Sequence, residues 1–286
     1  MLGCDFVGKV EQAGKNVSRH KEGDTIAALI WGGEVKGHGA YNDYTLANEH
    51  ISFKVPKSIS LEAAATVPLA SCTAWLALFS KDCLAIDRKS GEQTSVLIWG
   101  GSSSVGLYAI QIARLHNFNI VTVCSPKHHE HVKSLGADHV FDYKSDDVVD
   151  HIKHAAPRLQ YIFDTIGDKS SSATASHTLG EAGGTLCTVR PGKANTEGVS
   201  SQAKVTDVLV WTAFLKDHQY KEFKWPANED DHKLSAELFE NLPQWLEDGT
   251  IKPNQPKVLN GLDKVPEGFQ EYRDGKISGY KIVYAL

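Results

Sequence analysis

The sequence predicts an α/β protein in which a doubly wound parallel sheet is joined to a second, smaller β-rich domain. Two observations carry this prediction. From residue 95 onward, short apolar runs typical of buried strands alternate with segments of helical length, which is the pattern of a parallel sheet covered on both faces. Near both ends of the chain, strand-like runs broken by turns indicate separate β-structure.

Length, charge and cysteine content exclude several classes of protein. The chain has 286 residues, enough for two domains with a sizeable core, and a formal net charge of −5, which argues against a nucleic-acid-binding surface. It has no run of 18 apolar residues, which predicts no membrane-spanning helix, and its start lacks the features of a signal peptide. Its five scattered cysteines are typical of a cytoplasmic protein with reduced thiols.

The sequence also predicts no metal site. Neither C-x-x-C nor H-E-x-x-H occurs, and the thirteen histidines lack the spacing of metal ligands. The densest group, KHHEH at 127–131, is interpreted as a solvated helix start. We interpret His38 as structural, because no Cys or Glu lies near it at metal spacing.

The first 80 residues are expected to hold strands and one interrupted helix. Strands are expected within 5–14, 21–29 and 39–48, where loosely alternating runs are broken by glycines. Residues 60–79 predict a helix with Ser60 as its N-cap and an interruption at Pro68.

The central region predicts five parallel strands with helices between them. The strands are expected at 95–99, 119–124, 139–143, 161–167 and 183–189. Helices are expected over 105–116, up to Leu135 with Gly136 at the C-cap, near 146–154 and over 169–179. Residues 203–251 are interpreted as mostly helical with an aromatic-rich, charged break at 218–232, and 257–286 as strand, helix and strand.

The loop after the first of these strands predicts an anion site. In VLIWGGSSSVGLYAIQIAR, residues 96–114, a buried strand ends in glycines and opens a helix. Backbone N–H groups and a helix N-terminus then point toward one place, which suits the pyrophosphate of a dinucleotide. The strict G-x-G-x-x-G pattern is absent, and Ser103 stands where a close-approach glycine is expected. A tight turn without a ligand is the alternative interpretation.

The end of the second strand favours NADPH over NADH. NAD sites usually carry Asp or Glu there to bind the ribose 2′-hydroxyl. This chain has Cys124 and Ser125 at that place, followed by Lys127. A hydroxyl and a cation suit a 2′-phosphate, which a carboxylate would repel. The alternative is a surface serine and lysine with no ligand.

A family resemblance is carried by GCDFVGKVEQAGKNVSRHKEGDTI, GAYNDYTL, AAATVPLASCTAW, the glycine loop, SLGADHVFDY, IFDTIG and SGYKIVY, in this order. Together these stretches resemble the medium-chain dehydrogenase/reductase superfamily, in its zinc-independent, quinone-reductase-like branch. CSPKHHE, HVFDYKS, FKWPANEDD and SGYKIVY look most like fungal trans-acting enoyl reductases and related toxin-cluster reductases. The resemblance implies a Rossmann domain at 69–250 and a GroES-like domain, N-terminally incomplete, formed by 1–68 and 251–286.

The resemblance also implies site residues. Ser125 and Lys127 would hold the 2′-phosphate, and Tyr143 would lie by the adenosine ribose. Thr73 would orient the nicotinamide, and the 188–192 loop with Val189 would cover its reactive face. The residues expected at the cofactor phosphates are Gly100, Gly101, Ser102, Ser103, Ser104, Val105, Gly106 and Lys281.

The activity that the resemblance implies is NADPH-dependent reduction of an activated (enoyl) double bond. The expected substrate is a polyketide-like intermediate, free or carrier-tethered, and a polyketide synthase is the expected partner of a monomer or homodimer. The family carries several strands before the GCDF element, where this chain begins. We therefore expect NADPH affinity with weak turnover on generic enoyl thioesters.

A non-redox function is the alternative. Such a protein would bind a polyketide intermediate and catalyse a cyclisation, or assist a synthase. Trp211 and Phe214 are the expected lining of a substrate pocket under either reading, together with Tyr220, Phe223 and Trp225. Core packing is the competing interpretation of each of these aromatic residues.

Overall fold

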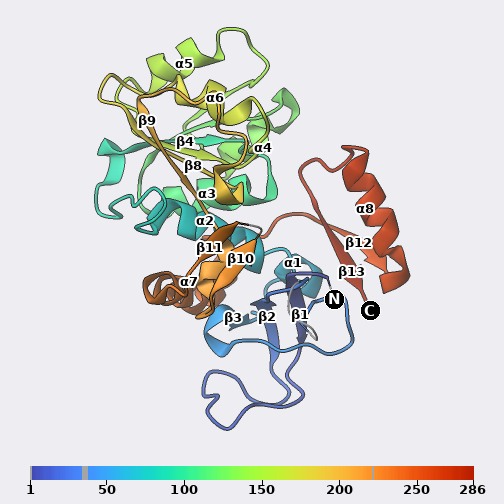
Figure 1. Ribbon diagram of the computed structural model, residues 1–286. Coiled ribbons are helices and arrows are strands. Elements are labelled where there is room, and N and C mark those ends of the chain that lie inside the picture. The colour runs from blue at the N-terminus through green and yellow to red at the C-terminus, as the bar shows by residue number, and fades with distance from the viewer. Residues whose placement is uncertain (1, 34–37, 221) are drawn as a thin grey trace. The chain divides into compact units, whose positions relative to one another are not determined.

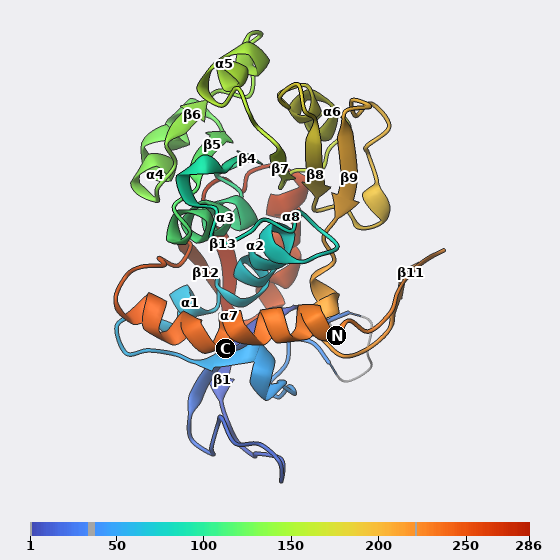
Figure 2. The same ribbon diagram turned by 90° about the vertical axis from the view of Figure 1, so that its left-hand side faces the viewer.

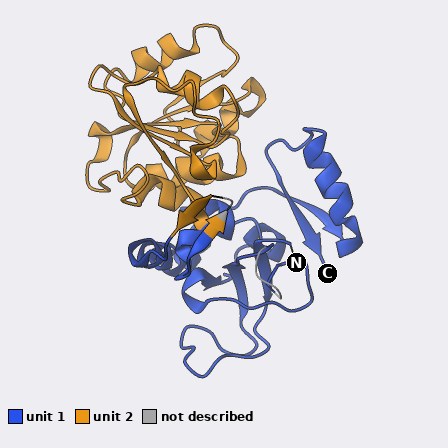
Figure 3. Cartoon of the chain, viewed as in Figure 1, with its two compact units in different colours: residues 1–72, 211–218, 226–286 blue, residues 73–210, 219–225 orange. Residues whose placement is uncertain are grey.

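The computed structural model describes residues 2–33, 38–220 and 222–286, apart from the side chain of Tyr220. The chain divides into two compact units (Figure 3). Unit 1 comprises residues 1–72, 211–218 and 226–286, and unit 2 comprises residues 73–210 and 219–225. Both ends of the chain therefore belong to one unit.

Unit 2 is built on a six-stranded parallel sheet in the order β6-β5-β4-β7-β8-β9, with helices around it (Figures 1 and 2). The order runs outward in both directions from β4 and β7, which places the topological switch point of the sheet between the carboxyl ends of these two strands. The strands are β4 Ser95–Trp99, β5 Asn119–Val123, β6 His139–Phe141, β7 Tyr161–Asp164, β8 Gly184–Thr188 and β9 Ala203–Asp207. The predicted doubly wound parallel sheet is confirmed.

The helices of unit 2 follow the strands as the sequence predicted. They are α3 Ser104–Leu115, α4 His129–Ser134, α5 Val148–Ala155 and α6 Ser171–Ser176, with short 3-10 turns at η2 Gly91–Gln93, η3 Pro126–His128 and η4 Pro191–Lys193. Gly136, after α4, has a φ of +114°, a conformation that glycine adopts without strain. Side chains of β4, β5, β7 and α5 form a buried core that includes Leu97, Val121, Ile152 and Ile162.

The prediction that residues 203–251 are mostly helical was wrong at its start. Residues 203–207 form β9, which pairs with β8 at the edge of the sheet. β10 His218–Tyr220 and β11 Phe223–Trp225 form a second, two-stranded sheet. Only Thr206 of β9 is buried, because β9 is an edge strand. Its sequence therefore shows no clear run of apolar residues.

Unit 1 contains a three-stranded antiparallel sheet in the order β1-β2-β3, formed by Asp5–Lys9, Thr25–Leu29 and Ser52–Lys54. The strand predicted within 39–48 is absent: residues 40–43 form bends, and residues 44–48 have no regular secondary structure. Asn42 Nδ2 donates to the carbonyl oxygen of Tyr44, a local hydrogen bond that competes with strand pairing. The interrupted helix was predicted correctly: Ser60 Oγ accepts from the amide of Ala63 at the start of α1 Leu61–Ala64, and Pro68 begins α2 Pro68–Phe79.

The sequence predicted no membrane-spanning helix, but the stretch 61–79 is long and apolar enough to be a candidate. By length and composition it could cross a membrane, but most of it is buried inside the protein. Core helices of soluble proteins have the same character, so the stretch is weak evidence for a membrane span.

Helix α7 Glu229–Glu247 belongs to unit 1, whereas the sequence placed it in the dinucleotide-binding domain. It packs on β3 and on the 3-10 turn η1 Glu49–Ile51. Phe239 of α7 lies with its ring 6.3 Å from that of Phe53, and Ser58 Oγ donates to Glu247 at 2.8 Å. The apolar face of an amphipathic helix does not specify its partner, so tertiary packing decided the assignment.

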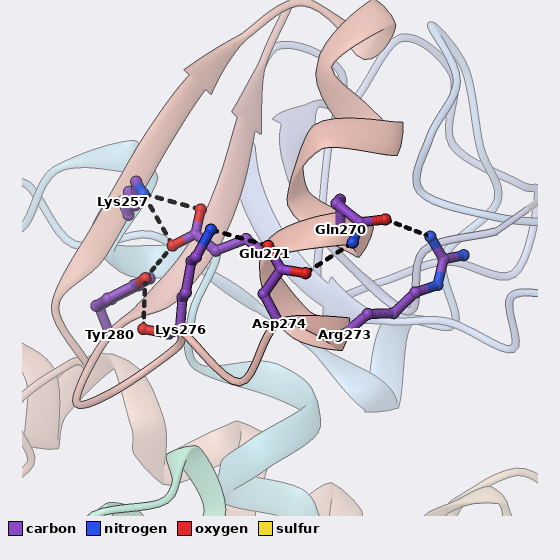
Figure 4. Close-up of polar contacts among 7 residues, drawn as sticks. All are labelled: Lys257, Gln270, Glu271, Arg273, Asp274, Lys276 and Tyr280. Atoms are coloured by element: carbon purple, nitrogen blue, oxygen red, sulfur yellow. Dashed lines mark hydrogen bonds and ion pairs between the residues drawn. The ribbon is translucent and has the colours of Figure 1, made fainter.

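The end of the chain forms a βαβ element in unit 1, as predicted. β12 Pro256–Asn260 and β13 Lys281–Ala285 pair in parallel and are joined through η6 Leu262–Lys264 and α8 Val265–Arg273. Figure 4 shows the polar contacts that tie this element together. Lys257 Nζ lies 2.8 Å from both carboxylate oxygens of Glu271, and Tyr280 Oη also donates to Glu271. The hydrogen bond from Lys257, followed by that from Tyr280, lowers the pKa of Glu271.

His20 is held as a neutral ring beside β3. Its Nε2 lies 2.8 Å from Ser52 Oγ, whose own proton points to the carbonyl oxygen of Asn48 at 2.9 Å or of Glu49 at 3.2 Å. Nε2 is therefore the donor, and Nδ1 is buried without a hydrogen-bond partner among the described residues. Burial, followed by the charge of Arg19, lowers the pKa of His20.

Mild acid should weaken unit 1 through His20. The pKa in the folded protein lies below the ordinary value of 6.5, so the stabilising contribution of the neutral ring is present above pH 6.5 and is lost as the pH falls toward the folded-state pKa. His20→Gln keeps a donor for Ser52 and removes the titration. Urea unfolding at pH 7 and pH 5 should show a larger loss for the wild type than for this variant. An equal loss in both proteins would contradict the assignment.

Candidate dinucleotide-binding site

The loop between β4 and α3 folds against the carboxyl end of β5. The amides of Gly100 and Gly101 both donate to the carbonyl oxygen of Val123, at 3.1 and 3.0 Å. The amide of Ser103 donates back to Gly100 at 2.9 Å. Gly100 has a φ of +89°, which residues with a side chain rarely adopt. The loop is therefore a tight turn fixed by main-chain hydrogen bonds.

The glycines are required by space as well as by conformation. A Cβ atom on Gly101 would lie 2.1 Å from Thr122 Oγ1, and one on Gly106 would lie 2.3 Å from the carbonyl oxygen of Gly100. The first turn of α3 and the loop therefore approach more closely than side chains would allow. Such close packing of loop, helix and strand is what a dinucleotide fingerprint requires of its glycines.

Ser103 is the N-cap of α3. Its Oγ accepts from the amide of Gly106 at 2.9 Å, so this hydroxyl serves the helix start. The amide of Val105 lies in the first turn, where no helical carbonyl is available to it. Together with the positive end of the helix dipole, this arrangement favours an anion at the loop. Ser102, Ser104 and Val105 are half-buried, which leaves part of the loop accessible to a ligand.

Two residues of this site were missed by sequence reasoning. Thr165 follows β7, and its Oγ1 lies 2.8 Å from the carbonyl oxygen of Trp99 and 2.8 Å from Ser103 Oγ. Asp164 ends β7 and is fully buried. The available signal was the polar pair Asp-Thr at the end of a buried strand, because the carboxyl ends of neighbouring parallel strands meet at one edge of a sheet.

The carboxylate of Asp164 organises the turn after β7. Its Oδ1 accepts from the amides of Ile166 at 2.9 Å and Gly167 at 3.0 Å. Its Oδ2 accepts from the hydroxyls of Ser171 and Ser172, each at 2.6 Å. Four donors therefore satisfy one buried carboxylate and fix the backbone that carries Thr165.

Ser125 and Lys127, the residues predicted for the 2′-phosphate, follow β5. Tyr143, the residue predicted for the ribose, follows β6, which is the neighbour of β5 in the sheet. Ser125 is half-buried, and Lys127 is exposed. Tyr143 is 42% exposed, and the ammonium of Lys144 lies 5.8 Å from its ring centroid. The structure therefore presents hydroxyl groups and cations along this edge.

Two further groups set the charge of this edge. Burial, followed by the charge of Lys127, lowers the pKa of His128. Asp142 contributes a carboxylate, whose Oδ1 accepts from the amide of Lys144 at 3.0 Å. Burial, together with the charge of Asp142, raises the pKa of Cys124 to about 11, so this thiol is protonated at neutral pH.

The other predicted site residues are distributed between the units. Val189 follows β8 in unit 2, and its amide donates to the carbonyl oxygen of Asp164 at 3.0 Å. Thr73 is a half-buried residue of α2 and the first residue of unit 2. Lys281 lies in unit 1, where its ammonium pairs with the carboxylate of Asp5. Of the predicted site residues, the glycine loop, Ser125, Lys127, Tyr143 and Val189 follow strands of the one parallel sheet, at the carboxyl ends of β4, β5, β6 and β8.

The aromatic residues predicted to line a substrate pocket lie in unit 1. Trp211 stacks on Trp31, with ring centroids 5.9 Å apart and an interplanar angle of 4°. Phe214 lies 6.1 Å from the same ring. Both are half-buried, so part of this cluster is open to solvent. Phe223 and Trp225 belong to β11 in unit 2, and the side chain of Tyr220 lies outside the described residues.

No metal-binding group is found where the structure describes the chain. Over residues 2–33, 38–220 and 222–286, no three His, Cys, Asp or Glu side chains are grouped so that they could hold a metal ion. All five cysteines are free thiols. Burial raises the pKa of Cys72 to about 12, which makes this thiol a poor nucleophile.

Comparison with known proteins decides the family. The pattern described as alcohol dehydrogenase GroES-like domain matches residues 1–57, and the pattern described as zinc-binding dehydrogenase matches residues 104–213. Trans-enoyl reductase ACTTS2 of Alternaria alternata is 32% identical over 295 aligned residues, which cover 100% of this chain and 83% of that protein. The chain belongs to the medium-chain dehydrogenase/reductase family.

One further relative supports the family, and one solved structure supports the fold. Trans-enoyl reductase eqxC of Fusarium heterosporum is 34% identical over 298 residues, which cover 100% of this chain and 84% of that protein. The crystal structure of a putative zinc-dependent alcohol dehydrogenase from Rhizobium etli CFN 42 superposes with a TM-score of 0.81. It is 22% identical, and the match covers 100% of this chain and 80% of that one, so it supports the fold.

Proposed function

We propose that this medium-chain dehydrogenase/reductase is an NADPH-dependent enoyl reductase that acts on a polyketide-like intermediate. The single observation that carries the proposal is the tight glycine loop at the start of α3, beside an edge that carries Ser125 and Lys127. The names of the relatives, trans-enoyl reductases of fungi, support the substrate class. When bound, NADPH supplies a hydride for an alkene conjugated to a carbonyl or thioester.

The chain's residues would bind the cofactor at two places. The amide of Val105, the hydroxyls of Ser102 and Ser104 and the positive end of α3 would hold the pyrophosphate. Ser125 and Lys127 would hold the 2′-phosphate through hydrogen bonds to its oxygens, and Tyr143 would lie beside the ribose. Lys281, whose ammonium pairs with Asp5 in unit 1, stays a predicted phosphate residue.

The remaining assignments concern the reacting end. Thr73 would orient the nicotinamide carboxamide, and the loop at Val189 would cover the reactive face. Trp211 and Phe214 would offer an apolar surface to the substrate, since both rings are only half-buried. The proposal includes no zinc, because the charge that develops on hydride addition is taken up by the substrate's own carbonyl oxygen. A carrier-tethered substrate, a synthase partner and a cytoplasmic location complete the proposal.

Titration with NADPH and NADH tests the proposal. We expect tighter binding of NADPH, and consumption of NADPH when an enoyl thioester that resembles a polyketide intermediate is added. Binding of neither cofactor would overturn the proposal and favour the non-redox function, in which a polyketide intermediate is bound and cyclised. Binding of NADPH without consumption of any enoyl thioester would overturn the reductase activity alone.

Replacement of Lys127 by alanine should weaken NADPH binding by about 1–2 kcal/mol, the scale of a charge-assisted contact. NADH binding should change little, because NADH has no 2′-phosphate. Lys133→Ala is the matched control: it removes an exposed cation of α4 that pairs with Glu130 at 3.1 Å. This control should leave both affinities within about twofold, since an exposed pair contributes little. Equal losses for NADPH and NADH in the Lys127 variant would exclude the proposed role.

A further inference from the structure

The hydroxyl of Thr165 links both ends of the 100–103 turn. Its Oγ1 lies 2.8 Å from the carbonyl oxygen of Trp99 and 3.0 Å from that of Gly100, where the turn begins. It also lies 2.8 Å from Ser103 Oγ, where the turn ends and α3 starts. Thr165 is only 8% exposed, so these hydrogen bonds are largely protected from water.

The protons of the two hydroxyls fix the direction of this chain of hydrogen bonds. The Thr165 hydroxyl carries one proton. Carbonyl oxygens cannot donate, so the hydrogen bonds from Thr165 Oγ1 to the carbonyl oxygens of Trp99 and Gly100 must use this proton. Ser103 Oγ already accepts from the amide of Gly106 at 2.9 Å and donates its own proton to Thr165. The sequence of donors is therefore Gly106 N–H, Ser103 O–H and Thr165 O–H, ending on the main chain of β4.

The position of Thr165 is itself fixed by its neighbours. Its amide donates to the carbonyl oxygen of Trp99 at 3.0 Å. The adjacent Asp164 carboxylate holds the next two amides, those of Ile166 and Gly167. The hydroxyl of Thr165 is thus presented to the loop by a rigid backbone, which a positioning residue requires.

We propose that Thr165 is a positioning residue for the cofactor pyrophosphate and acts through Ser103. In this inference, which rests on the proposed function, the Ser103 hydroxyl is committed to Thr165 and Gly106 and does not bind a phosphate oxygen. Its contribution is to hold the loop amides in place. Binding of the pyrophosphate then depends on the hydrogen bond between Thr165 and Ser103, even though neither hydroxyl contacts the pyrophosphate.

Two variants of Thr165 and both cofactors test the proposal. Thr165→Val keeps the shape of the side chain and removes the hydroxyl, whereas Thr165→Ser keeps the hydroxyl. We expect Kd to rise about 5- to 10-fold in the valine variant, equally for NADPH and NADH, because both carry the pyrophosphate. The serine variant should rescue affinity to within about twofold of the wild type. The Lys127 variant differs in kind, since it affects NADPH alone.

A double-mutant cycle separates positioning from independent effects. Ser103→Ala should raise Kd by about the same factor as Thr165→Val, and the double variant should bind no worse than either single variant, since both break one chain of hydrogen bonds. Losses that multiply in the double variant would overturn the proposal. If Thr165→Val fails to fold, Ser103→Ala decides: unchanged affinity for both cofactors would also overturn it. A wild type that binds neither cofactor would overturn the proposed function and this inference together.

Discussion

Replacement of Asp164 by alanine should lower the free energy of unfolding of unit 2 by about 3–4 kcal/mol, because four donors would each lose their acceptor at about 1 kcal/mol apiece. The carboxylate is fully buried and accepts from two amides and two hydroxyls. A domain is typically stable by only about 5–15 kcal/mol, so this loss is a large fraction of the total. Asp164→Asn keeps one oxygen for the two amides and should cost less.

Hydrogen exchange measures this effect within unit 2. A chain with two compact units need not unfold in one step, so exchange at the core amides of β4 and β7 is preferable to a single global transition. Asp168→Ala is the matched control: this exposed carboxylate accepts from the amides of Ser170 and Ser171, each at 2.8 Å. The Asp168 carboxylate and the amide of Ser170 are exposed and can turn to water, and only the amide of Ser171 is buried, so the control should lose about 1 kcal/mol, less than the Asp164 variant. Similar losses in both variants would contradict the role given to burial.

Replacement of Gly106 by alanine should reduce the affinity for both cofactors about 10- to 100-fold, the loss that corresponds to an overpacking cost of about 1–3 kcal/mol at the loop. The new Cβ would lie 2.3 Å from the carbonyl oxygen of Gly100 and 2.9 Å from the Cα of Gly101. These are backbone atoms, so the loop and α3 must move apart. Alanine improves helix propensity by about 1 kcal/mol, which offsets part of the cost of about 1–3 kcal/mol for overpacking.

The Gly106 variant should therefore lose much of its affinity for the cofactor but little of its stability. Cofactor titration should show the large loss, and thermal unfolding should show a small one. Gly8→Ala in β1 provides the control, because a Cβ there meets only the Phe6 ring at 3.5 Å, an ordinary contact. It should leave cofactor binding unchanged. Wild-type affinity in the Gly106 variant would show that the close approach of α3 to the loop does not matter for binding.

Features determined by neighbouring residues could be predicted from the sequence. The Ser60 cap, the start of α2 at Pro68 and the C-cap at Gly136 follow from local hydrogen bonding and backbone conformation. Four strands of the parallel sheet, β4, β5, β7 and β8, are largely buried and therefore appear as apolar runs. β6 was also predicted, although it lies at the edge of the sheet and its three residues are only half-buried. β9 was missed because only one of its five residues is buried. The segment 39–48 was misjudged: the amides of Ala40 and Tyr41 donate to the carbonyl oxygens of Gly3 and Leu2, and the segment forms no regular strand.

The sequence alone determined the parallel sheet, the glycine loop and the family resemblance, because each depends on residue types at fixed spacing along the chain. The tertiary structure alone decided which partners these elements take. It assigned α7 to unit 1, paired Lys281 with Asp5 and brought Thr165 to Ser103 across 62 positions of sequence. These contacts depend on strand order and packing, and a pattern of residues along one strand or helix contains no information about the neighbour that it will meet.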